Sequence, residues 1–519
     1  MYLTQGLHRS LQRHPEKTAL CHLAPAGERT WTFAEFADAV ARRAAALRGR
    51  GIARGDRVAI LAPNDDAIVI TMMACWWIGA VACPMNIRWS VHELRHAIAD
   101  CGAPLLLVDP GCAGVAAALA DIVATAETGA LAAEARALAP LEDLRCGGDT
   151  LAVILYTGGT TGRSKGVMLS HVNLWSASMT RGAELNNAPD SVSLLVAPLF
   201  HVAGLGRLIG QSIVGGSCIT LPQFRGDAVL AAIERHRISD IMVVPTMLQA
   251  LLDAPGFTPE RVRSLTRIAF GAAPMPPDLL DRALAAWPQA EFFQAYGLTE
   301  TAGAVCINLP ANHRPGAGAP ERLRSVGRAG LGAEIRIVDE RGDECPRGAV
   351  GELIVAGPMV TRGYWNLPDT SAEAIRDGWL HTGDGARMDA DGYIFIVDRL
   401  KDMIISGGEN VYSAEVEAAL RSHPSVAEAA VIGVPDARWG ESVHAVVVLH
   451  AGAGADQAAL FDELGAWCRT RLAGYKCPRS LHVAEALPLS AAGKVLKTAL
   501  RAGHASRAAR AAGAVGAGA

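Results

Sequence analysis

Short apolar runs that alternate with helix-like segments are the feature that most constrains the fold of this chain. Residues 57–61, 105–108 and 151–155 have the length and composition of buried strands, and segments with helical patterning separate them. Strands that alternate with helices favour a parallel sheet covered by helices. Because 519 residues are too many for one hydrophobic core, we expect two or more domains.

The pattern changes at about residue 325, where shorter alternating segments favour a partly antiparallel or barrel-like unit. After Lys401 the pattern favours a small α+β domain. The expected fold class is therefore α/β, with a large N-terminal domain of helix-covered, mostly parallel sheets plus a small distorted barrel, and a small C-terminal α+β domain. The predicted limits are 1–400 and 401–503, followed by a disordered Ala/Gly/Arg-rich tail at 504–519.

Charge and cysteine content exclude several classes of protein. The formal net charge of −4 provides no basic field for nucleic acid and no basic face for a membrane surface. The 11 cysteines form no Cys-x-x-Cys pair, so neither a disulfide framework nor a zinc ribbon is indicated. Reduced thiols in a cytoplasmic protein are the simplest interpretation.

One uncharged apolar segment, residues 67–85, is just long enough to cross a bilayer. Asp65 and Asp66 precede it, Gly79 and Pro84 interrupt its end, and no positive flank accompanies it. We therefore expect a helix buried between the sheet and other helices, and no integral membrane segment.

A second pattern, His92-Glu93-x-x-His96, matches the helical signature of zinc proteases, in which the histidines bind the metal and the glutamate acts as base. The competing interpretation is that Ser90 and Glu93 form a helix-capping box and that the histidines lie on the solvated side. No third ligand with suitable spacing follows, which favours the capping box.

A loop rich in glycine and threonine, YTGGTTGRSKG from Tyr156 to Gly166, follows the apolar run at 151–155. Successive N–H groups of such a loop form a concavity for anions, and Lys165 adds a positive charge suited to phosphate. The loop differs from the common P-loop, because Ser164 precedes the lysine and Gly166 follows it. A polyphosphate site, with ATP as the expected ligand, is our hypothesis; a flexible surface loop is the alternative.

Other unusual loops also follow predicted strands. The turn from Gly271 to Pro274 follows a strand at 267–270, and the run YGLTET from Tyr296 follows a strand at 292–295. Ligands in open α/β sheets collect at the carboxyl ends of strands. We therefore expect these loops to converge with the Tyr156 loop.

These motifs, with HTGD ending at Asp384 and DRLKD from Asp398, stand in the order found in the AMP-forming acyl-CoA synthetases. The chain resembles that family from about Leu11 to Arg501, within the superfamily that includes peptide-synthetase adenylation domains and beetle luciferases. The resemblance implies that a carboxylic acid is joined to the α-phosphate of ATP with release of pyrophosphate. The acyl group then passes to CoA, so ATP, Mg²⁺ and CoA are the implied cofactors.

The resemblance also implies roles for single residues of the nucleotide site. Tyr296 would stack on adenine, Thr299 would bond phosphate oxygens, and Glu300 would hold Mg²⁺ as the metal ligand. Asp384, assisted by Arg399, would accept hydrogen bonds from the ribose hydroxyls.

The glycine-rich loop departs from the family pattern at two positions. Thr157 to Lys165 would hold the β- and γ-phosphates, although Gly158 replaces the usual serine and Ser164 a frequent proline. The implied nucleotide- and cofactor-binding residues are Thr157, Gly158, Gly159, Thr160, Thr161, Gly162, Lys165, Gly271, Ala272, Ala273, Pro274, Gln294, Ala295, Tyr296, Gly297, Asp384, Arg399, Lys401, Gly407 and Gly408.

Two lysines near the C-terminus match functional positions of the family. Lys494 would bridge an oxygen of the acid and the α-phosphate, where a preorganised cation is worth about 3 kcal/mol. Lys401 lies at the family hinge, about which the small domain would rotate between the two half-reactions. That rotation would withdraw Lys494 and bring Gly407 and Gly408 to the path of the CoA arm. The implied catalytic residues are Lys494, Glu300, Thr299 and His201.

The acid itself is constrained by the residues around His201, which resembles the gate of the acyl pocket. Residues 202–206 and Leu208 are small or apolar, which favours an uncharged tail and hence a medium- or long-chain fatty acid. Arg207 would favour a dicarboxylate if it faced the pocket, but we expect a surface salt bridge. Alternatives are an aryl acid of the cinnamate or benzoate type, or an adenylating module that loads a carrier protein. The oligomeric state, a homodimer included, is left open.

Overall fold

The computed structural model describes residues 1–24, 27–157, 164–273, 275–314, 320–406, 409–436, 438–450, 457–490 and 495–516. The chain forms two compact units. The first contains Met1–Ile335, Ile354–Thr382 and Ala390–Ile394, and the second contains Arg336–Leu353, Gly383–Asp389 and Phe395–Ala519. The α/β class with a separate C-terminal unit is confirmed, whereas the domain limits given above stay a prediction.

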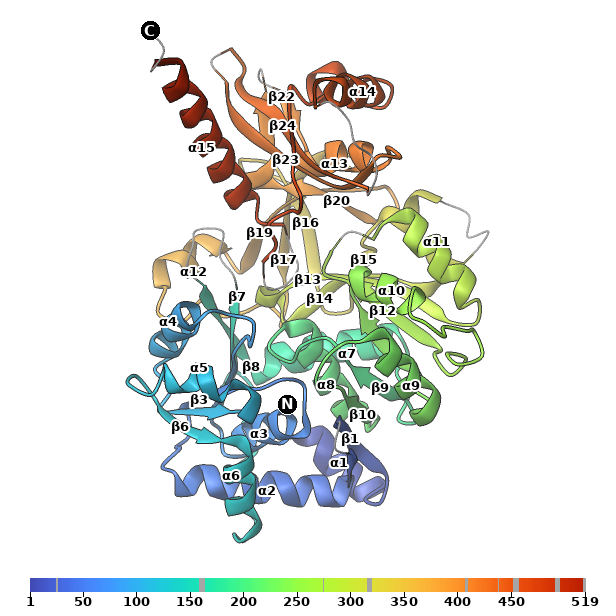
Figure 1. The fold of residues 1–519 in the computed structure, drawn as a ribbon. Helices are drawn as coiled ribbons and strands as arrows, with labels where there is room; N and C mark the ends of the chain where they lie inside the picture. The colour runs from blue at the N-terminus through green and yellow to red at the C-terminus, as the bar shows by residue number, and fades with distance from the viewer. Residues whose placement is uncertain are drawn as a thin grey trace. The chain divides into compact units, whose positions relative to one another are not determined.

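Two sheets form the framework of the first unit (Figure 1). In one, five neighbouring strands pair in parallel and β8 closes the edge in antiparallel fashion. Its order is β6 (Ala124–Glu127), β5 (Leu105–Val108), β3 (Arg57–Leu61), β4 (Val81–Pro84), β7 (Leu151–Thr157) and β8 (Lys165–Ser170).

The larger sheet has a parallel centre and antiparallel edges. Its order is β15 (Arg328–Ala329), β14 (Gly303–Asn308), β13 (Glu291–Leu298), β12 (Arg267–Gly271), β11 (Asp240–Val243), β9 (Val192–Leu195), β10 (Ser217–Thr220), β1 (Thr18–Ala24) and β2 (Gly27–Thr32). The predicted strands at 57–61, 105–108, 151–155 and 267–270 are thus found.

Twelve helices lie in the described part of the first unit. They are α1 (Gln5–Arg13), α2 (Phe33–Gly49), α3 (Asp66–Trp77), α4 (Val91–Cys101), α5 (Ala113–Ala117), α6 (Thr128–Arg136), α7 (His171–Glu184), α8 (Val202–Val214), α9 (Gly226–His236), α10 (Pro245–Leu252), α11 (Pro277–Ala286) and α12 (Pro368–Ala374). Capping boxes begin three of them: Thr32 at α2, Ser90 at α4 and Ser170 at α7.

The apolar segment at 67–85 is shorter as a helix than its composition predicts. Helix α3 ends at Trp77, because Gly79 turns the chain with φ +69° and β4 follows. Both elements are buried. Over the described ranges, no helix has the length and apolar character needed to span a membrane.

A third sheet joins the shorter strands that follow residue 333. Strands β16 (Glu334–Val338), β17 (Val350–Ala356), β19 (Trp379–Met388) and β18 (Ile375–Arg376) lie in that order, and β20 (Ile394–Arg399) pairs with β19. This sheet corresponds to the predicted barrel-like part.

The C-terminal part of the second unit is a sheet with helices on both faces. Its order is β22 (Glu409–Val411), β21 (Ile404–Ser406), β24 (Gly440–Leu449) and β23 (Val426–Asp436), with β25 (Ser480–Val483) beside β24. Alternate residues of β23 pack in two different cores: Val431 with α13 (Ser413–Arg421) and α14 (Gln457–Arg469), and Ile432 with Leu500 of α15. Figure 1 shows α15 across the sheet from α13 and α14.

Helix α15 (Lys497–Gly516) extends through most of the tail that we expected to be disordered. Its alanines and arginines are good helix formers. Leu500 packs against β23, and the ring of His504 lies 4.5 Å from that of His444 on β24. Contacts of Leu500 and His504 therefore attach the beginning of α15 to the sheet, although the composition of the tail did not predict such packing.

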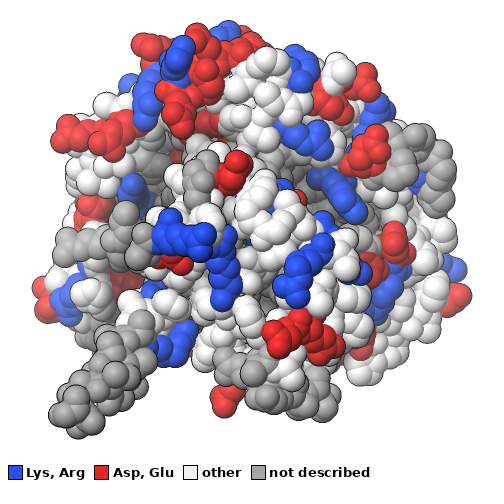
Figure 2. Space-filling model, turned by 90° about the horizontal axis from the view of Figure 1, so that it is seen from above, with Lys and Arg blue, Asp and Glu red and all other residues white. Residues whose placement is uncertain are grey.

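The surface charge and the cysteines agree with the composition. Acidic and basic side chains are mixed over the face shown in Figure 2. All 11 cysteines are free thiols, and most are buried.

Candidate active site

The strands on either side of the glycine-rich loop form a hairpin. Thr157, the last residue of β7, pairs with Lys165, the first residue of β8, and its Oγ1 lies 3.5 Å from the Lys165 carbonyl oxygen. The predicted phosphate-binding residues Gly158, Gly159, Thr160, Thr161 and Gly162 lie outside the described residues. The hairpin nevertheless places the two ends of the loop, Thr157 and Lys165, opposite each other.

A segment far along the chain joins this hairpin to the end of β13. The Lys165 ammonium lies over the ring of Tyr364, 5.1 Å from its centroid. The Tyr364 hydroxyl donates a hydrogen bond of 2.9 Å to Oε1 of Glu300, and the Thr361 N–H donates one of 2.7 Å to the Glu300 carbonyl. The predicted convergence of the Tyr156 loop and the Tyr296 loop is thereby confirmed for the residues described.

Residues without bulky side chains line the neighbouring strand ends. Gly271 pairs with Ala295, and a Cβ at Gly271 would collide with the Ala295 carbonyl. A Cβ at Gly297 would likewise collide with the carbonyl of Gly303. Ala272 has a left-handed backbone with φ +64°, a strained conformation that often marks functional turns.

The other predicted residues of this edge are at least partly accessible. Gln294, Ala295 and Tyr296 on β13 are half-buried, and Ala273 is exposed, whereas Pro274 lies outside the described residues. A ligand could therefore contact this edge of the sheet.

Thr299 and Glu300 lie on a single turn of 3₁₀ helix, Thr299–Thr301. The Thr301 hydroxyl fixes that turn: its Oγ1 accepts from the Leu298 N–H at 2.9 Å and donates to the Gly303 carbonyl at 2.6 Å. Thr299 and Glu300 are half-buried. A carboxylate held in this way is a suitable ligand for Mg²⁺, a hard cation that binds carboxylates and phosphates.

The acyl-gate candidate His201 stands at the N-terminus of α8, and its ring contacts that of Phe200 edge to face at 4.8 Å between centroids. Arg207 does form an ion pair, with Asp240, but the expected surface location is wrong. The two side chains are 3% and 4% exposed. The small and apolar residues around Arg207 on α8 lie in the interior, and its partner Asp240 is on the large sheet.

Asp384 and Arg399 meet in the second unit. The Arg399 Nε lies 2.7 Å from Oδ1 of Asp384, whose side chain is 5% exposed. Lys401 lies on a short 3₁₀ turn, Leu400–Asp402, and Asp402 pairs with Arg501 of α15 at 3.0 Å. Gly407, Gly408 and Lys494 lie outside the described residues.

Two residues that matter here escaped the sequence analysis. Tyr364 connects Lys165 and Glu300, but it belongs to no motif that we considered. Asp398 was considered only as part of DRLKD; its Oδ2 accepts from the Ser413 hydroxyl at 2.6 Å and from the Ala414 N–H at 3.3 Å. Because 15 residues separate Asp398 from Ser413, no local sequence signal indicated this contact.

The zinc interpretation of His92, Glu93 and His96 finds no support. The Glu93 carboxylate accepts from the Ser90 N–H and hydroxyl at 2.8 and 2.7 Å, and the His96 Nε2 lies 3.2 Å from the Ser164 carbonyl. Among the described residues, the group of potential metal ligands within 4.8 Å of one another is Cys21, Glu28 and His236.

Comparison with known proteins identifies the family of this chain. The family of AMP-binding enzymes matches residues 7–365, and the AMP-binding enzyme C-terminal domain matches residues 415–494. A feruloyl-CoA synthase of Amycolatopsis sp. is 43% identical, over 95% of this chain and 97% of that protein. The long-chain-fatty-acid–CoA ligase FadD13 of Mycobacterium tuberculosis is 35% identical, over 92% and 94%.

A solved structure is similar over almost the whole chain. The o-succinylbenzoate CoA synthetase of Bacillus subtilis, in complex with its acyl-adenylate intermediate, has a TM-score of 0.86, 34% identity, and coverage of 96% of this chain and 97% of that one. The same enzyme is known in complex with ATP and magnesium ion.

The fold and site define an adenylate-forming enzyme. The chain belongs to the AMP-binding enzyme family, as an acyl-CoA synthetase, and is an AMP-forming acid–thiol ligase. Ligases of this family use ATP, Mg²⁺ and CoA.

Proposed function

We propose that the acid is an aryl acid of the cinnamate type, and that its carboxylate is joined to the α-phosphate of ATP before the acyl group passes to CoA. The observation that carries this choice is the buried Arg207–Asp240 pair, two turns after His201 on α8. A charged pair at this depth suits a short acid better than a long alkyl tail. The 43% identity to a feruloyl-CoA synthase points the same way.

A medium- or long-chain fatty acid is the second candidate. The small and apolar residues 202–206 and the 35% identity to FadD13 favour it. Loading of a carrier protein instead of CoA is a further alternative, because a fatty acid–[acyl-carrier-protein] ligase of Streptomyces coeruleorubidus is also 35% identical.

The proposed roles on the first unit follow the site. Thr157 and Lys165 would contact the terminal phosphates, where Tyr364 holds the lysine head against its ring. Glu300 would hold Mg²⁺, which when bound neutralises phosphate charge. Tyr296 and the 271–273 turn would contact the base.

The proposed roles on the second unit involve Asp384 and Arg399, together with residues of the predicted domain 401–503. Asp384 and Arg399 would bind the ribose, and Lys494 would stabilise the negative charge that builds up as the carboxylate attacks phosphorus. Rotation at Lys401 would then exchange Lys494 for Gly407 and Gly408 at the site. We also infer a cytoplasmic location, supported by the 11 free thiols.

An acid panel tests the choice of substrate. The purified enzyme is given ATP, Mg²⁺ and CoA with cinnamate, ferulate, benzoate, hexanoate or palmitate, and pyrophosphate release is measured. We expect kcat/KM for ferulate, whose ring hydroxyl can form a hydrogen bond with the buried charged pair, to exceed that for palmitate by about tenfold or more, the scale of one hydrogen bond to a charged group. A preference for palmitate would instead support the fatty acid. Turnover that needs a phosphopantetheinyl carrier in place of CoA would support the carrier alternative.

A further inference from the structure

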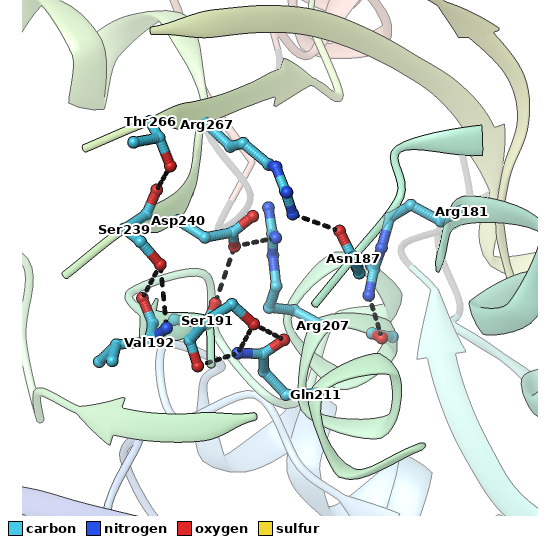
Figure 3. A network of polar contacts seen from close by, with 12 residues as sticks. Arg181, Asn187, Ser191, Val192, Arg207, Gln211, Ser239, Asp240, Thr266 and Arg267 are labelled. Atoms are coloured by element: carbon cyan, nitrogen blue, oxygen red, sulfur yellow. Dashed lines mark hydrogen bonds and ion pairs between the residues drawn. The ribbon is translucent and has the colours of Figure 1, made fainter. Parts of the chain in front are cut away.

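A cluster of buried cations lies at one end of the large sheet. The turn at 271–273, which we propose contacts the base and call the nucleotide-binding turn, lies at the opposite end. Arg207 on α8 pairs with Asp240, the first residue of β11, and Asp240 also accepts from the Ser193 hydroxyl at 3.0 Å. Arg181 on α7 donates to the Gly206 carbonyl at 2.9 Å. Figure 3 shows Arg207 extending from α8 to Asp240, with Arg181 and Arg267 beside it.

The cluster holds more positive charge and more donors than its own residues satisfy. Arg181 and Arg207 face one carboxylate, that of Asp240. Within the described ranges, Nε and Nη2 of Arg207 and Nε of Arg181 are buried without a hydrogen-bond partner. Burial, and after it the charge of Arg207, lowers the pKa of Arg181 to about 9. A buried guanidinium normally has its donors paired, so these three donors indicate an acceptor that comes from elsewhere.

The cluster and the nucleotide-binding turn lie on the same face of the sheet. Strand residues alternate between faces, and Asp240 pairs with Arg267 while Met242 pairs with Ala269. Gly271 and Ala295 therefore share with Asp240 the face that packs against α7 and α8. From Arg267 to Gly271 the strand rises about 13 Å, which an acid of moderate length can span.

Several side chains on this face are small, and two side chains are only partly buried. The positions next to the turn include the small residues Ala269, Gly271 and Ala295, and also the buried Phe293, which pairs with Ala269. Met242 and Ala304 are only partly buried, although they lie beside the core that Ala269 and Phe293 form. An acyl group that enters at the turn would thus meet small side chains first and the arginines last.

We propose that Arg207 and Arg181 form the distal end of the acyl site and select acids that carry a second carboxylate. This inference rests on the proposed function, because it assumes that the first carboxylate reacts at the turn. One added negative charge balances the cluster, and its oxygens can accept from Nη2 and Nε of Arg207 in the planar geometry that guanidinium offers.

A matched series of acids on one scaffold tests the proposal. Cinnamate, 4-hydroxycinnamate and 4-carboxycinnamate differ only at the distal end, and each is assayed by pyrophosphate release with CoA. We expect kcat/KM to rise along the series, with 4-carboxycinnamate about tenfold or more above cinnamate. The variant R181M/R207M/D240L removes both arginines and the carboxylate that they share, so that none of these three charges is left unpaired. We expect it to abolish this ratio while cinnamate is still used.

A second variant and a control separate selection from a structural role. In Asp240→Asn the guanidinium keeps its place but loses its internal carboxylate, so the preference for the dicarboxylate should increase. Arg43→Met removes another buried arginine, bonded to Thr71 at 2.8 Å on α2 and α3, and should leave the ratio unchanged. A wild-type preference for cinnamate that persists in both Arg207 and Asp240 variants would overturn the proposal. Absence of pyrophosphate release with every acid would instead refute the proposed function.

Discussion

At the scale of single residues, Tyr364 shows what a sequence motif leaves out. Lys165 was predicted from the glycine-rich loop, and the roles of Thr299 and Glu300 were implied by the family resemblance. In the structure, Lys165 and Glu300 both contact Tyr364. The tyrosine itself is about 200 residues from the lysine and stands in no pattern of its own. Arg207 was misplaced for a related reason, since its partner Asp240 lies on a strand that the sequence does not connect to α8.

Removal of one hydroxyl group tests the role of Tyr364. Tyr364→Phe keeps the ring under Lys165 but removes the 2.9 Å hydrogen bond to Glu300. A hydrogen bond to a charged group is worth about 1.5–3 kcal/mol, so we expect the Mg²⁺ concentration for half-maximal pyrophosphate release to rise about tenfold or more. Tyr393→Phe, which removes a hydroxyl that lies 3.1 Å from the Asn312 amide, is the control. An unchanged Mg²⁺ dependence in Tyr364→Phe would show that the tyrosine does not orient Glu300.

At the scale of elements, strands and capped helices could be predicted because their signals are local. The box predicted at Ser90 begins a helix at the expected residue, and the boxes at Thr32 and Ser170 are equally local signals. Helix α15 could not, because an Ala/Arg-rich tail has no apolar face strong enough to indicate packing. Two contacts hold it: Leu500 packs against β23, and His504 contacts His444 on β24, which lies 60 residues earlier in the chain.

The histidine contact predicts that acid destabilises the second unit. Burial first, and then His504, Arg507 and His482, lower the pKa of His444 from 6.5 to about 4. Below pH 6.5 the unfolded state therefore binds a proton at His444 that the folded state does not bind. The contribution of neutral His444 to the unfolding free energy is fully present above pH 6.5 and is lost as the pH falls from 6.5 to about 4. Between these values, His444 should contribute up to about one proton, or about 1.4 kcal/mol per pH unit, to the slope of unfolding free energy.

Chemical unfolding at several pH values measures that slope. His444→Asn keeps a polar atom near the Ser480 hydroxyl, which lies 2.7 Å from Nδ1, but does not titrate. Its unfolding free energy should depend on pH less steeply than that of the wild type between pH 4.5 and 6. His14→Asn, at an exposed histidine, should keep the wild-type slope. Equal slopes in all three proteins would contradict the proposed contribution of His444 to the pH dependence of stability.

At the scale of the whole molecule, the order of motifs was sufficient for the fold class and the reaction class. The order of motifs along the chain can be read without knowing how the chain folds. A set of short motifs in a fixed order can therefore identify the family of a large enzyme. The acid is different, because its specificity depends on which side chains from α7, α8 and β11 meet in the interior. No spacing rule connects Arg181, Arg207 and Asp240.

The two proposed lysines predict opposite defects in the two half-reactions. Lys494→Ala should abolish acyl-adenylate formation but leave intact the transfer to CoA from supplied acyl-adenylate. Lys401→Pro should restrict the hinge and slow the transfer more than adenylation. Both half-reactions are measured separately, by pyrophosphate release without CoA and by thioester formation from the adenylate. Equal damage to both steps in Lys494→Ala, or unimpaired transfer in Lys401→Pro, would refute the respective role.

The absence of room for a Cβ at Gly271 and Gly297 has a consequence for how such a site can diversify. Backbone packs directly against backbone at these two glycines, so replacing either glycine with a larger residue would cause a clash. The surface on which we place the nucleotide should therefore change little in evolution. The helices α7 and α8 face the same sheet with ordinary side chains, each of which can be replaced singly. Evolutionary change should therefore be concentrated on α7 and α8: new acids can be acquired by point mutation, while the requirement for an adenine nucleotide is inherited unchanged.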